Sequence, residues 1–220
     1  MNLNQYIDHT LLKASATEGE ILELCKEANA YDFKTVCVNS CYVSLAKQSL
    51  ENSKVGVCTV IGFPLGAMST EAKVYEAKKA KQDGADEIDM VINLGFLKSK
   101  NYVAVYKDIS DVKRAIGKTT LKVILEISEL SKNEIVRACE ICVDANADFV
   151  KTSTGFAKGG ATLTAVKIMK KTVKDQAKIK ASGGIRTLES AKKYIDAGVE
   201  RIGTSSGVAI LSGTVSNSKY

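Results

Sequence analysis

The feature that most constrains this chain is a regular alternation of short apolar runs with longer amphipathic stretches. Eight runs rich in β-branched residues recur along the sequence, at 5–10, 33–39, 55–62, 87–93, 121–127, 149–153, 177–182 and 200–203. Most are apolar at nearly every position, which is typical of parallel strands. The pattern therefore predicts a parallel sheet that is buried on both faces.

The stretches between these runs carry the signals of helices. Capping boxes stand at Thr17 with Glu20 and at Ser131 with Glu134, and amphipathic patterns cover 69–83 and 187–197. Eight strand–helix units in 220 residues leave about 27 residues each, enough for a strand, a helix and two short loops. We therefore expect an α/β fold, a (β/α)8 barrel in a single domain over 1–220. An open doubly wound sheet is the alternative, but no G-x-G-x-x-G motif follows the first run.

Composition excludes several classes of protein. No apolar run approaches the roughly 18 residues that a membrane span needs, and we expect a cytoplasmic protein. The net charge of +6 comes mainly from scattered lysines, and the charged stretch 71–79 is interpreted as a solvated helix surface. Because nucleic-acid readers cluster basic residues and favour arginine, no nucleic-acid partner and no membrane partner are expected.

The six cysteines do not form a metal-binding pattern. Cys139 and Cys142 have C-x-x-C spacing, but no second matching pair accompanies them, and both fall on the apolar face of an expected helix. Cys58 lies within an apolar run. We expect buried free cysteines in a reducing compartment and no metal site. The only histidine, His9, cannot complete a metal cluster or a Ser-His-Asp triad alone.

Three charged residues lie in or at the ends of expected strands. Lys151 ends one run, Lys180 ends another, and Asp89 lies between Ile88 and Met90. Charged groups in apolar strands are costly unless they are paired or used, and a barrel places its chemistry at the carboxyl ends of its strands. An ion pair closing the barrel would explain one such residue. Two lysines and one aspartate together favour a catalytic cluster.

Two neighbouring lysines have a specific chemical use. A lysine at its reference pKa of about 10.4 is neutral in only about one molecule in 2,500 at pH 7. Burial and a second ammonium group both disfavour the charge and can bring a lysine pKa near 7. The neutral amine can then attack a carbonyl carbon and form an iminium, which accepts electrons during carbon–carbon cleavage. The second lysine and the aspartate would move protons, so this chemistry needs no cofactor.

Glycine and serine residues follow the last two expected strands. Gly183 and Gly184 precede one helix, and Gly203, Ser205 and Ser206 precede a short one near the end of the chain. Backbone N–H groups and hydroxyls at such turns bind anions, and barrels commonly bind phosphate after strands seven and eight. We therefore expect a phosphate site there.

Taken in order, six segments resemble the deoxyribose-phosphate aldolase family. They are IDHTLLK at 7–13, VIGFPLG at 60–66, ADEIDMVIN at 85–93, VKTSTGF at 150–156, IKASGGIRT at 179–187 and RIGTSSG at 201–207. The resemblance implies a (β/α)8 class I aldolase that reversibly cleaves 2-deoxy-D-ribose 5-phosphate into D-glyceraldehyde 3-phosphate and acetaldehyde, in deoxyribose phosphate catabolism. It also implies a homodimer or a higher homo-oligomer.

The resemblance also implies roles for individual residues. Lys151 matches the lysine that forms the Schiff base, and Lys180 matches the lysine that perturbs it and helps to move protons. Asp89 matches the acid/base aspartate. Gly183, Gly184, Gly203, Ser205 and Ser206 match the positions that hold the substrate phosphate. Strand position alone leaves the choice between Lys151 and Lys180 open.

The chain departs from the family pattern in two places. Ala14 stands where proline is frequent, and residues 127–129 differ from the usual continuation of their strand. Tyr220 is the candidate counterpart of a C-terminal tyrosine that transfers protons in some members. Two other functions stay open: a phosphosugar isomerase or lyase without a covalent intermediate, and a phosphosugar-binding barrel without turnover.

Overall fold

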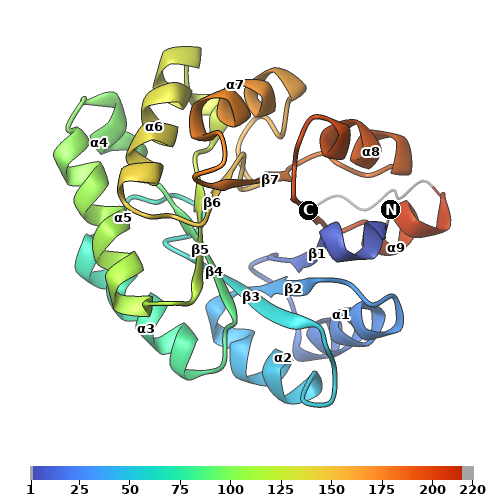
Figure 1. Ribbon diagram of the computed structural model, residues 1–220. Helices are drawn as coiled ribbons and strands as arrows, with labels where there is room; N and C mark the ends of the chain where they lie inside the picture. The colour runs from blue at the N-terminus through green and yellow to red at the C-terminus, as the bar shows by residue number, and fades with distance from the viewer. Residues whose placement is uncertain (1, 215–220) are drawn as a thin grey trace.

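The computed structural model describes residues 2–214, and they form one closed barrel of parallel strands. Neighbouring strands pair in sequence order, and β1 closes the ring by pairing with β8, so the predicted (β/α)8 architecture is confirmed. Helices surround the strands (Figure 1). The strands are β1 (Ile7–Leu11), β2 (Thr35–Val38), β3 (Gly56–Ile61), β4 (Glu87–Val91), β5 (Thr120–Ile124), β6 (Phe149–Lys151), β7 (Lys178–Ser182) and β8 (Arg201–Thr204).

The helices begin where the capping signals predict. Thr17 and Ser131 both form complete capping boxes, and Ser69 and Thr187 accept a hydrogen bond from the backbone of the first turn. The α-helices are α1 (Glu18–Ala30), α2 (Val43–Ser49), α3 (Thr70–Gln82), α4 (Leu94–Lys98), α5 (Tyr102–Ile116), α6 (Lys132–Asp144), α7 (Leu163–Val173), α8 (Leu188–Asp196) and α9 (Gly207–Ser212). Residues 2–214 also contain three short 3-10 helices, η1 (Leu3–Tyr6), η2 (Ser40–Tyr42) and η3 (Ile127–Glu129).

Seven of the eight strands are shorter than the runs that predict them, and β8 has the predicted length but begins one residue later. Residues 5 and 6 belong to η1, and Ile127 begins η3 because Glu126 adopts a left-handed backbone with φ of 55°. Apolar residues thus continue beyond the ladders into the loops, where they pack under the helices. Within the described residues, no helix has both the length and the apolar character needed to cross a bilayer.

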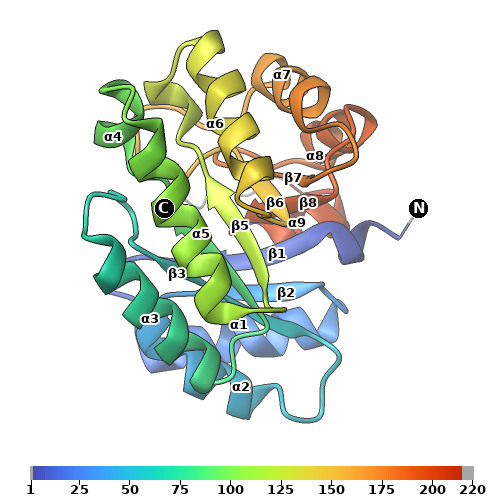
Figure 2. The same cartoon turned by 60° about the vertical axis from the view of Figure 1, so that its left-hand side comes forward.

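One stretch interpreted as solvated contains a buried ion pair. Lys73 in α3 is fully buried, and its Nζ contacts Asp108 Oδ2 of α5 at 2.5 Å and donates to the Val91 carbonyl at 3.0 Å. Helices α3 and α5 lie side by side outside the barrel (Figure 2). Lys73 shares a helix face with the buried Ala77 and Ala80, so helical periodicity places it inward despite its charge.

Five of the six cysteines are buried and free, as predicted, whereas Cys41 is exposed. Cys41 belongs to η2, the 3-10 turn that follows the carboxyl end of β2, and its side chain is exposed there. Burial raises the pKa of the Cys139 thiol to about 12 and that of Cys142 well above its ordinary value. These two thiols of α6 are therefore packing groups in the helix–barrel interface.

Candidate active site

The three charged residues singled out from the sequence meet inside the barrel. Lys151 is the last residue of β6, whereas Asp89 lies in the middle of β4 and Lys180 in the middle of β7. The Nζ atoms of both lysines lie 2.8 Å from the same oxygen, Asp89 Oδ2. Lys180 is thus not at a strand end as expected, because β7 continues through Ser182.

Asp89 belongs to a larger set of buried charges. Lys122 of β5 contacts Asp89 Oδ1 at 2.8 Å and Glu87 Oε2 at 2.6 Å, and Lys180 contacts Asp8 Oδ2 at 2.5 Å. The guanidinium of Arg201 bridges Asp8 and Glu87. Asp8 Oδ2 and Glu87 Oε2 form ion pairs with these lysines, but the geometry of the contacts is not that of a hydrogen bond.

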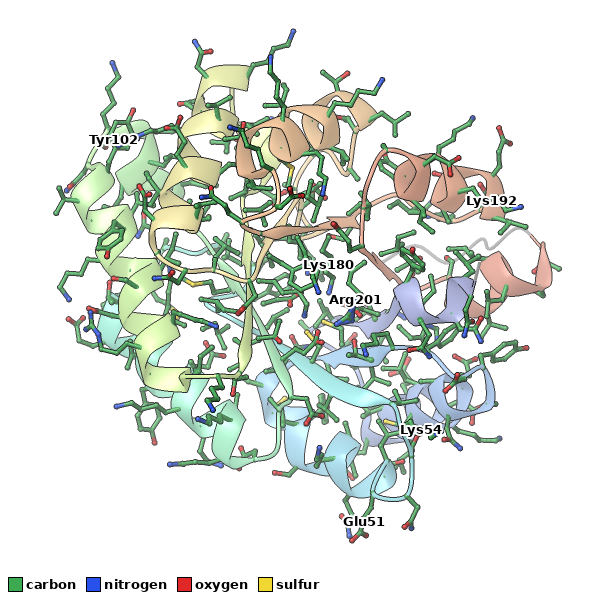
Figure 3. The ribbon with its side chains drawn as sticks, viewed as in Figure 1. Glu51, Lys54, Tyr102, Lys180, Lys192 and Arg201 are labelled. Carbon is green, nitrogen blue, oxygen red and sulfur yellow. The ribbon has the colours of Figure 1, made fainter. Side chains whose placement is uncertain are left out.

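These contacts close a ring in which acidic and basic side chains alternate. We call it the charge ring; in order of contact its members are Asp89, Lys122, Glu87, Arg201, Asp8 and Lys180. Three carboxylates and three cations make the ring neutral, and Lys151 is attached to it only through Asp89. Figure 3 places Lys180 and Arg201 at the centre of the barrel, while Lys192 and Glu51 lie at its periphery.

The ring fixes the charge state of its members. Burial opposes ionisation of Asp89, but Lys122, Lys151 and Lys180 hold its pKa well below the usual range. Burial likewise opposes the charge of Lys180, yet Asp8 and Asp89 raise its pKa well above the ordinary value. Asp89 is therefore a carboxylate at neutral pH, and Lys180 is a cation.

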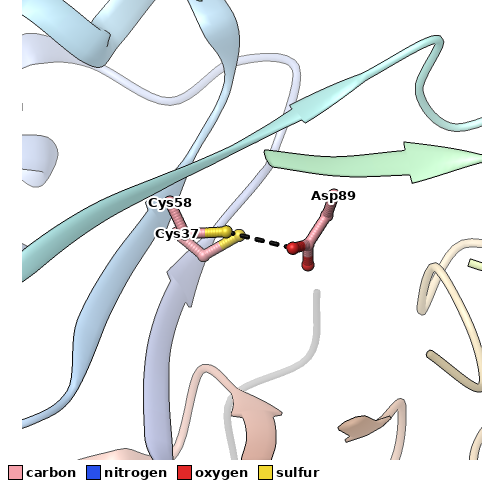
Figure 4. Close-up of side chains that lie close together, drawn as sticks. All are labelled: Cys37, Cys58 and Asp89. Carbon is pink, nitrogen blue, oxygen red and sulfur yellow. Dashed lines mark hydrogen bonds between the residues drawn. The ribbon is translucent and has the colours of Figure 1, made fainter. Parts of the chain in front are cut away.

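Two cysteines line the barrel beside Asp89. Cys37 of β2 and Cys58 of β3 are paired in register, and the Cys58 thiol donates to Asp89 Oδ1 at 3.2 Å (Figure 4). A hydrogen bond with Cys58, opposed by burial, lowers the pKa of Cys37 to about 7. The two sulfurs and one Asp89 oxygen lie within 4.8 Å of one another, a spacing that metal ions use. A cation there would have to displace the Lys122 ammonium, which contacts both Asp89 and Cys58.

A buried carboxyl group supports the loop that follows Lys151. Glu126 accepts hydrogen bonds from the backbone N–H of Thr154 at 3.3 Å and from the Thr154 hydroxyl. Burial raises the pKa of Glu126. In the following segment, which departs from the family pattern, Ser128 packs so closely against Gly159 that a side chain at 159 would lie 2.9 Å from the Ser128 Cβ. This carboxyl group and Ser128 therefore hold the β6–α7 loop over the barrel mouth.

The glycine and serine residues of the expected phosphate site lie on two adjacent turns. Gly183 and Gly184 have φ of 90° and 83° in the β7–α8 turn, and Ser205 and Ser206 form the β8–α9 turn. The Thr204 hydroxyl donates to the carbonyl of Ile185 at 2.7 Å and accepts from the Ser206 N–H at 3.0 Å. It thereby ties the two turns together. A Cβ on Gly184 would meet no atom within 4 Å, so its backbone is open to an approaching group.

Gly203 lies apart from those turns, within β8. A Cβ at this position would lie 3.0 Å from both Lys180 Cε and Ser182 Cβ. Because Gly203 has no side chain, it leaves room for the Lys180 side chain to reach Asp89. The phosphate contact expected of Gly203 stays a prediction, and the packing around it gives this glycine a second reason to be there.

Sequence reasoning missed the remaining members of the ring. Lys122 is a charged residue inside an apolar run, the same signal that identified Asp89, and Arg201 opens the last strand. Asp8 and Glu87 lie near the amino ends of their strands, away from the edge where barrel chemistry is sought. Only three-dimensional closure brings these ends under the lysines. Tyr220 lies outside the described residues.

Comparisons with known proteins agree with this geometry. The profile of the DeoC/LacD family of aldolases matches residues 3–213. A deoxyribose-phosphate aldolase of Finegoldia magna is 60% identical over 213 residues, which cover 97% of this chain and 100% of that protein. Deoxyribose-phosphate aldolase 1 of Mesoplasma florum is 54% identical, with both chains covered in full. The tetrameric deoxyribose phosphate aldolase structure from Aeropyrum pernix is 36% identical with a TM-score of 0.89, over 96% of this chain and 89% of that one. This chain belongs to the DeoC/LacD family of aldolases.

Proposed function

We propose that this aldolase reversibly cleaves 2-deoxy-D-ribose 5-phosphate into D-glyceraldehyde 3-phosphate and acetaldehyde, through a Schiff base on Lys151. The observation that carries the mechanism is that Lys151 and Lys180 contact one oxygen of Asp89 in a closed barrel. Curated relatives at 60% and 54% identity are named for this activity. The proposal thus joins the chemistry of the cluster to the substrate of the relatives.

The number of ion pairs supports Lys151 as the nucleophile. Lys180 contacts two carboxylates, whereas Asp89 is the one carboxylate that Lys151 contacts among residues 2–214, and Asp89 keeps two further cations. Removing the proton of Lys151 therefore breaks one ion pair, and removing that of Lys180 breaks two. Lys151 also ends its strand at the mouth of the barrel, where an aldehyde enters first. These contacts favour Lys151 where strand position alone could not decide.

The proposed reaction begins when the neutral amine of Lys151 attacks the C1 aldehyde carbon of the open-chain sugar. Loss of water gives the iminium. Removal of the proton from the C3 hydroxyl then lets the C2–C3 bond break, and its electron pair moves into the iminium to form an enamine. D-Glyceraldehyde 3-phosphate leaves, a proton is returned to C2, and water hydrolyses the new iminium to release acetaldehyde.

Asp89 and Lys180 are positioned for the proton transfers. Asp89 Oδ2 lies 2.8 Å from the Nζ atoms of Lys151 and Lys180, so it holds both lysines where a proton can pass between them through the substrate hydroxyl. Because the pKa of Asp89 is held low, we assign Asp89 the role of a fixed acceptor that orients both ammonium groups. The turns with Gly183, Gly184, Ser205 and Ser206 would hold the phosphate by backbone N–H groups and hydroxyls.

Two finer features belong to the same proposal. One relative is described as a tetramer, and we propose that this chain also forms a homo-oligomer. We further propose that it acts in the cytoplasm on a phosphosugar. Size-exclusion chromatography with light scattering measures the first, and a monomer at micromolar concentration would contradict it.

Borohydride trapping tests the covalent step. Protein incubated with acetaldehyde or deoxyribose 5-phosphate is reduced with borohydride, digested and analysed by mass spectrometry. We expect one stable adduct, on Lys151, and its loss together with turnover in a folded Lys151→Leu variant. An adduct on Lys180 would reverse the two lysines. Folded protein that binds the phosphosugar without any adduct would favour a non-covalent isomerase or lyase, or a binding barrel.

A further inference from the structure

The charge ring contains residues that the reaction does not use directly. Lys122, Glu87, Arg201 and Asp8 lie beneath the three proposed catalytic residues and have side chains between 0 and 13% exposed. A barrel core of this size is ordinarily filled by branched apolar side chains. Burying four additional charges is expensive, so their arrangement needs a reason beyond packing.

Lys122 is the member with the most contacts. Its Nζ lies 2.8 Å from Asp89 Oδ1, 2.6 Å from Glu87 Oε2 and 3.3 Å from Cys58 Sγ, with Asp8 Oδ2 at 3.9 Å. It therefore occupies the oxygen of Asp89 that the other two lysines leave unused. With Oδ1 held by Lys122, only Oδ2 is presented to Lys151 and Lys180.

The ring also sets the charge that surrounds Lys151. Its three carboxylates and three cations cancel, so a protonated Lys151 is the one surplus charge of the cluster. A neutral Lys151 leaves every carboxylate of the ring with two cationic partners. The same loss from Lys122 would leave Asp89 Oδ1 without its cation, with only the Cys58 thiol as a donor, and Glu87 with Arg201 as its only cation in the ring.

We propose that Lys122 is a positioning residue for the aldol reaction: it orients Asp89 and keeps the charge ring neutral, so that Lys151 alone can release its proton without leaving a buried carboxylate underpaired. This inference rests on the proposed function, because it assigns the nucleophile to Lys151. It adds a role for Lys122, Glu87 and the balance of charge between them.

Paired charge changes test this role. Lys122→Met leaves the ring with one excess negative charge, which favours the ammonium form of Lys151. Glu87→Gln leaves one excess positive charge and disfavours that form. The double variant Lys122→Met/Glu87→Gln removes two groups in contact at 2.6 Å and restores neutrality. A purely structural role for Lys122 predicts no such opposite signs.

The measurement is the pH dependence of kcat/KM for deoxyribose 5-phosphate cleavage, together with the rate of cyanoborohydride trapping of acetaldehyde on Lys151. Lys122 and Lys151 are separated by two 2.8 Å contacts and the width of one carboxylate. At an effective dielectric constant near 20, we expect Lys122→Met to move the acid limb upward by about 1.5 pH units. Glu87→Gln should move it downward by less, and the double variant should return within about half a unit of wild type.

Other groups near Lys151 stay unchanged in these variants. Lys151 is faced by Asp89 from β4, Lys180 from β7, Cys37 from β2 and Glu126 after β5. Because all four are present in every protein compared, differences between the profiles report the ring. A matched control applies the same two substitutions to the exposed pair of α8, Lys193→Met/Glu189→Gln, and should leave the profile in place.

Two results would overturn the inference. The first is a single variant that is folded by circular dichroism and whose acid limb lies at the wild-type pH. The second is a double variant whose acid limb is displaced as far as that of Lys122→Met. If Lys122→Met does not fold, the downward shift in Glu87→Gln and the unshifted double variant decide the question. If the wild-type protein forms no adduct on Lys151, the proposed function is refuted. If the adduct forms normally but the pH profiles of the variants coincide with that of wild type, only the role of the ring is refuted.

Discussion

Replacing Lys180 by leucine should displace the acid limb of the pH–rate profile by a calculable amount. Lys180 and Lys151 each lie 2.8 Å from Asp89 Oδ2, so their nitrogen atoms are at most twice that distance, 5.6 Å, apart. Two unit charges at this separation repel by about 3 kcal/mol at an effective dielectric constant of 20. Because one pH unit corresponds to about 1.4 kcal/mol, loss of the Lys180 charge favours the ammonium form of Lys151 by about two pH units.

The assay is kcat/KM for deoxyribose 5-phosphate cleavage between pH 5 and 10. We expect the acid limb of Lys180→Leu to lie about two units higher than that of wild type, which reduces kcat/KM by about 100-fold at pH values below the wild-type limb from this effect alone. Lys192→Leu, an exposed lysine of α8, is the matched control and should behave as wild type (Figure 3). A folded Lys180→Leu protein whose limb stays in place would refute the electrostatic reasoning.

Three further variants test the scaffold of the site. Asp108→Asn leaves the buried ammonium of Lys73 without a counter-charge and should lower the free energy of unfolding by about 3–5 kcal/mol in urea titrations. The double variant Lys73→Met/Asp108→Leu should recover this loss. An unchanged urea midpoint in Asp108→Asn would contradict a stabilising pair. Gly203→Ala places a Cβ 3.0 Å from Lys180 Cε and should lower kcat at least about tenfold without unfolding the protein; full activity would show that the strand can yield. Burial opposes ionisation of Asp8, but its ion pairs lower the pKa of this carboxyl group from 3.8. The Asp8 carboxylate therefore stabilises the fold above pH 3.8, and this contribution is lost as the pH falls further. Asp8→Asn should flatten the decline of the urea midpoint between about pH 5 and 2.5, and a decline as steep as that of wild type would contradict this prediction.

Local patterns in the sequence were sufficient to predict the architecture. Each run of nearly continuous apolar residues became a strand of the barrel, because strands buried on both faces need apolar side chains at every position. Thr17 and Ser131 mark helix starts because their hydroxyls satisfy backbone N–H groups that no earlier turn can bind. Such short-range signals do not depend on how the chain closes.

The cluster of Asp89, Lys151 and Lys180 could also be predicted, but only in part. Asp89, Lys151 and Lys180 each interrupt or end an apolar run, so the cost of burial identifies them one at a time. Their common oxygen could not be inferred, since it depends on the stagger of β4, β6 and β7 around the barrel. The middle position of Lys180 in β7 depends on the same register.

Charge patterns were misleading where the partner was distant in sequence. Lys73 stands among Glu and Lys residues that do face solvent, and its partner Asp108 lies 35 residues away on another helix. Only the spacing of Lys73 with Ala77 and Ala80 shows that it faces inward. A charged residue at helical spacing from buried apolar residues thus indicates an oppositely charged partner on another element, not an exposed helix face.

The charge ring explains why a barrel can bury so many ions and still keep one lysine available. Every carboxylate of the ring has at least two cationic contacts, so none depends on Lys151 for its neutrality. Lys151 is also the lysine with a single carboxylate contact and the one at the strand end nearest the mouth. Because neutrality is completed without it, the covalent chemistry that we propose for Lys151 can proceed while the charges of the ring stay fixed. The cost of burying the ring thus supports a site whose electrostatics are set before substrate arrives.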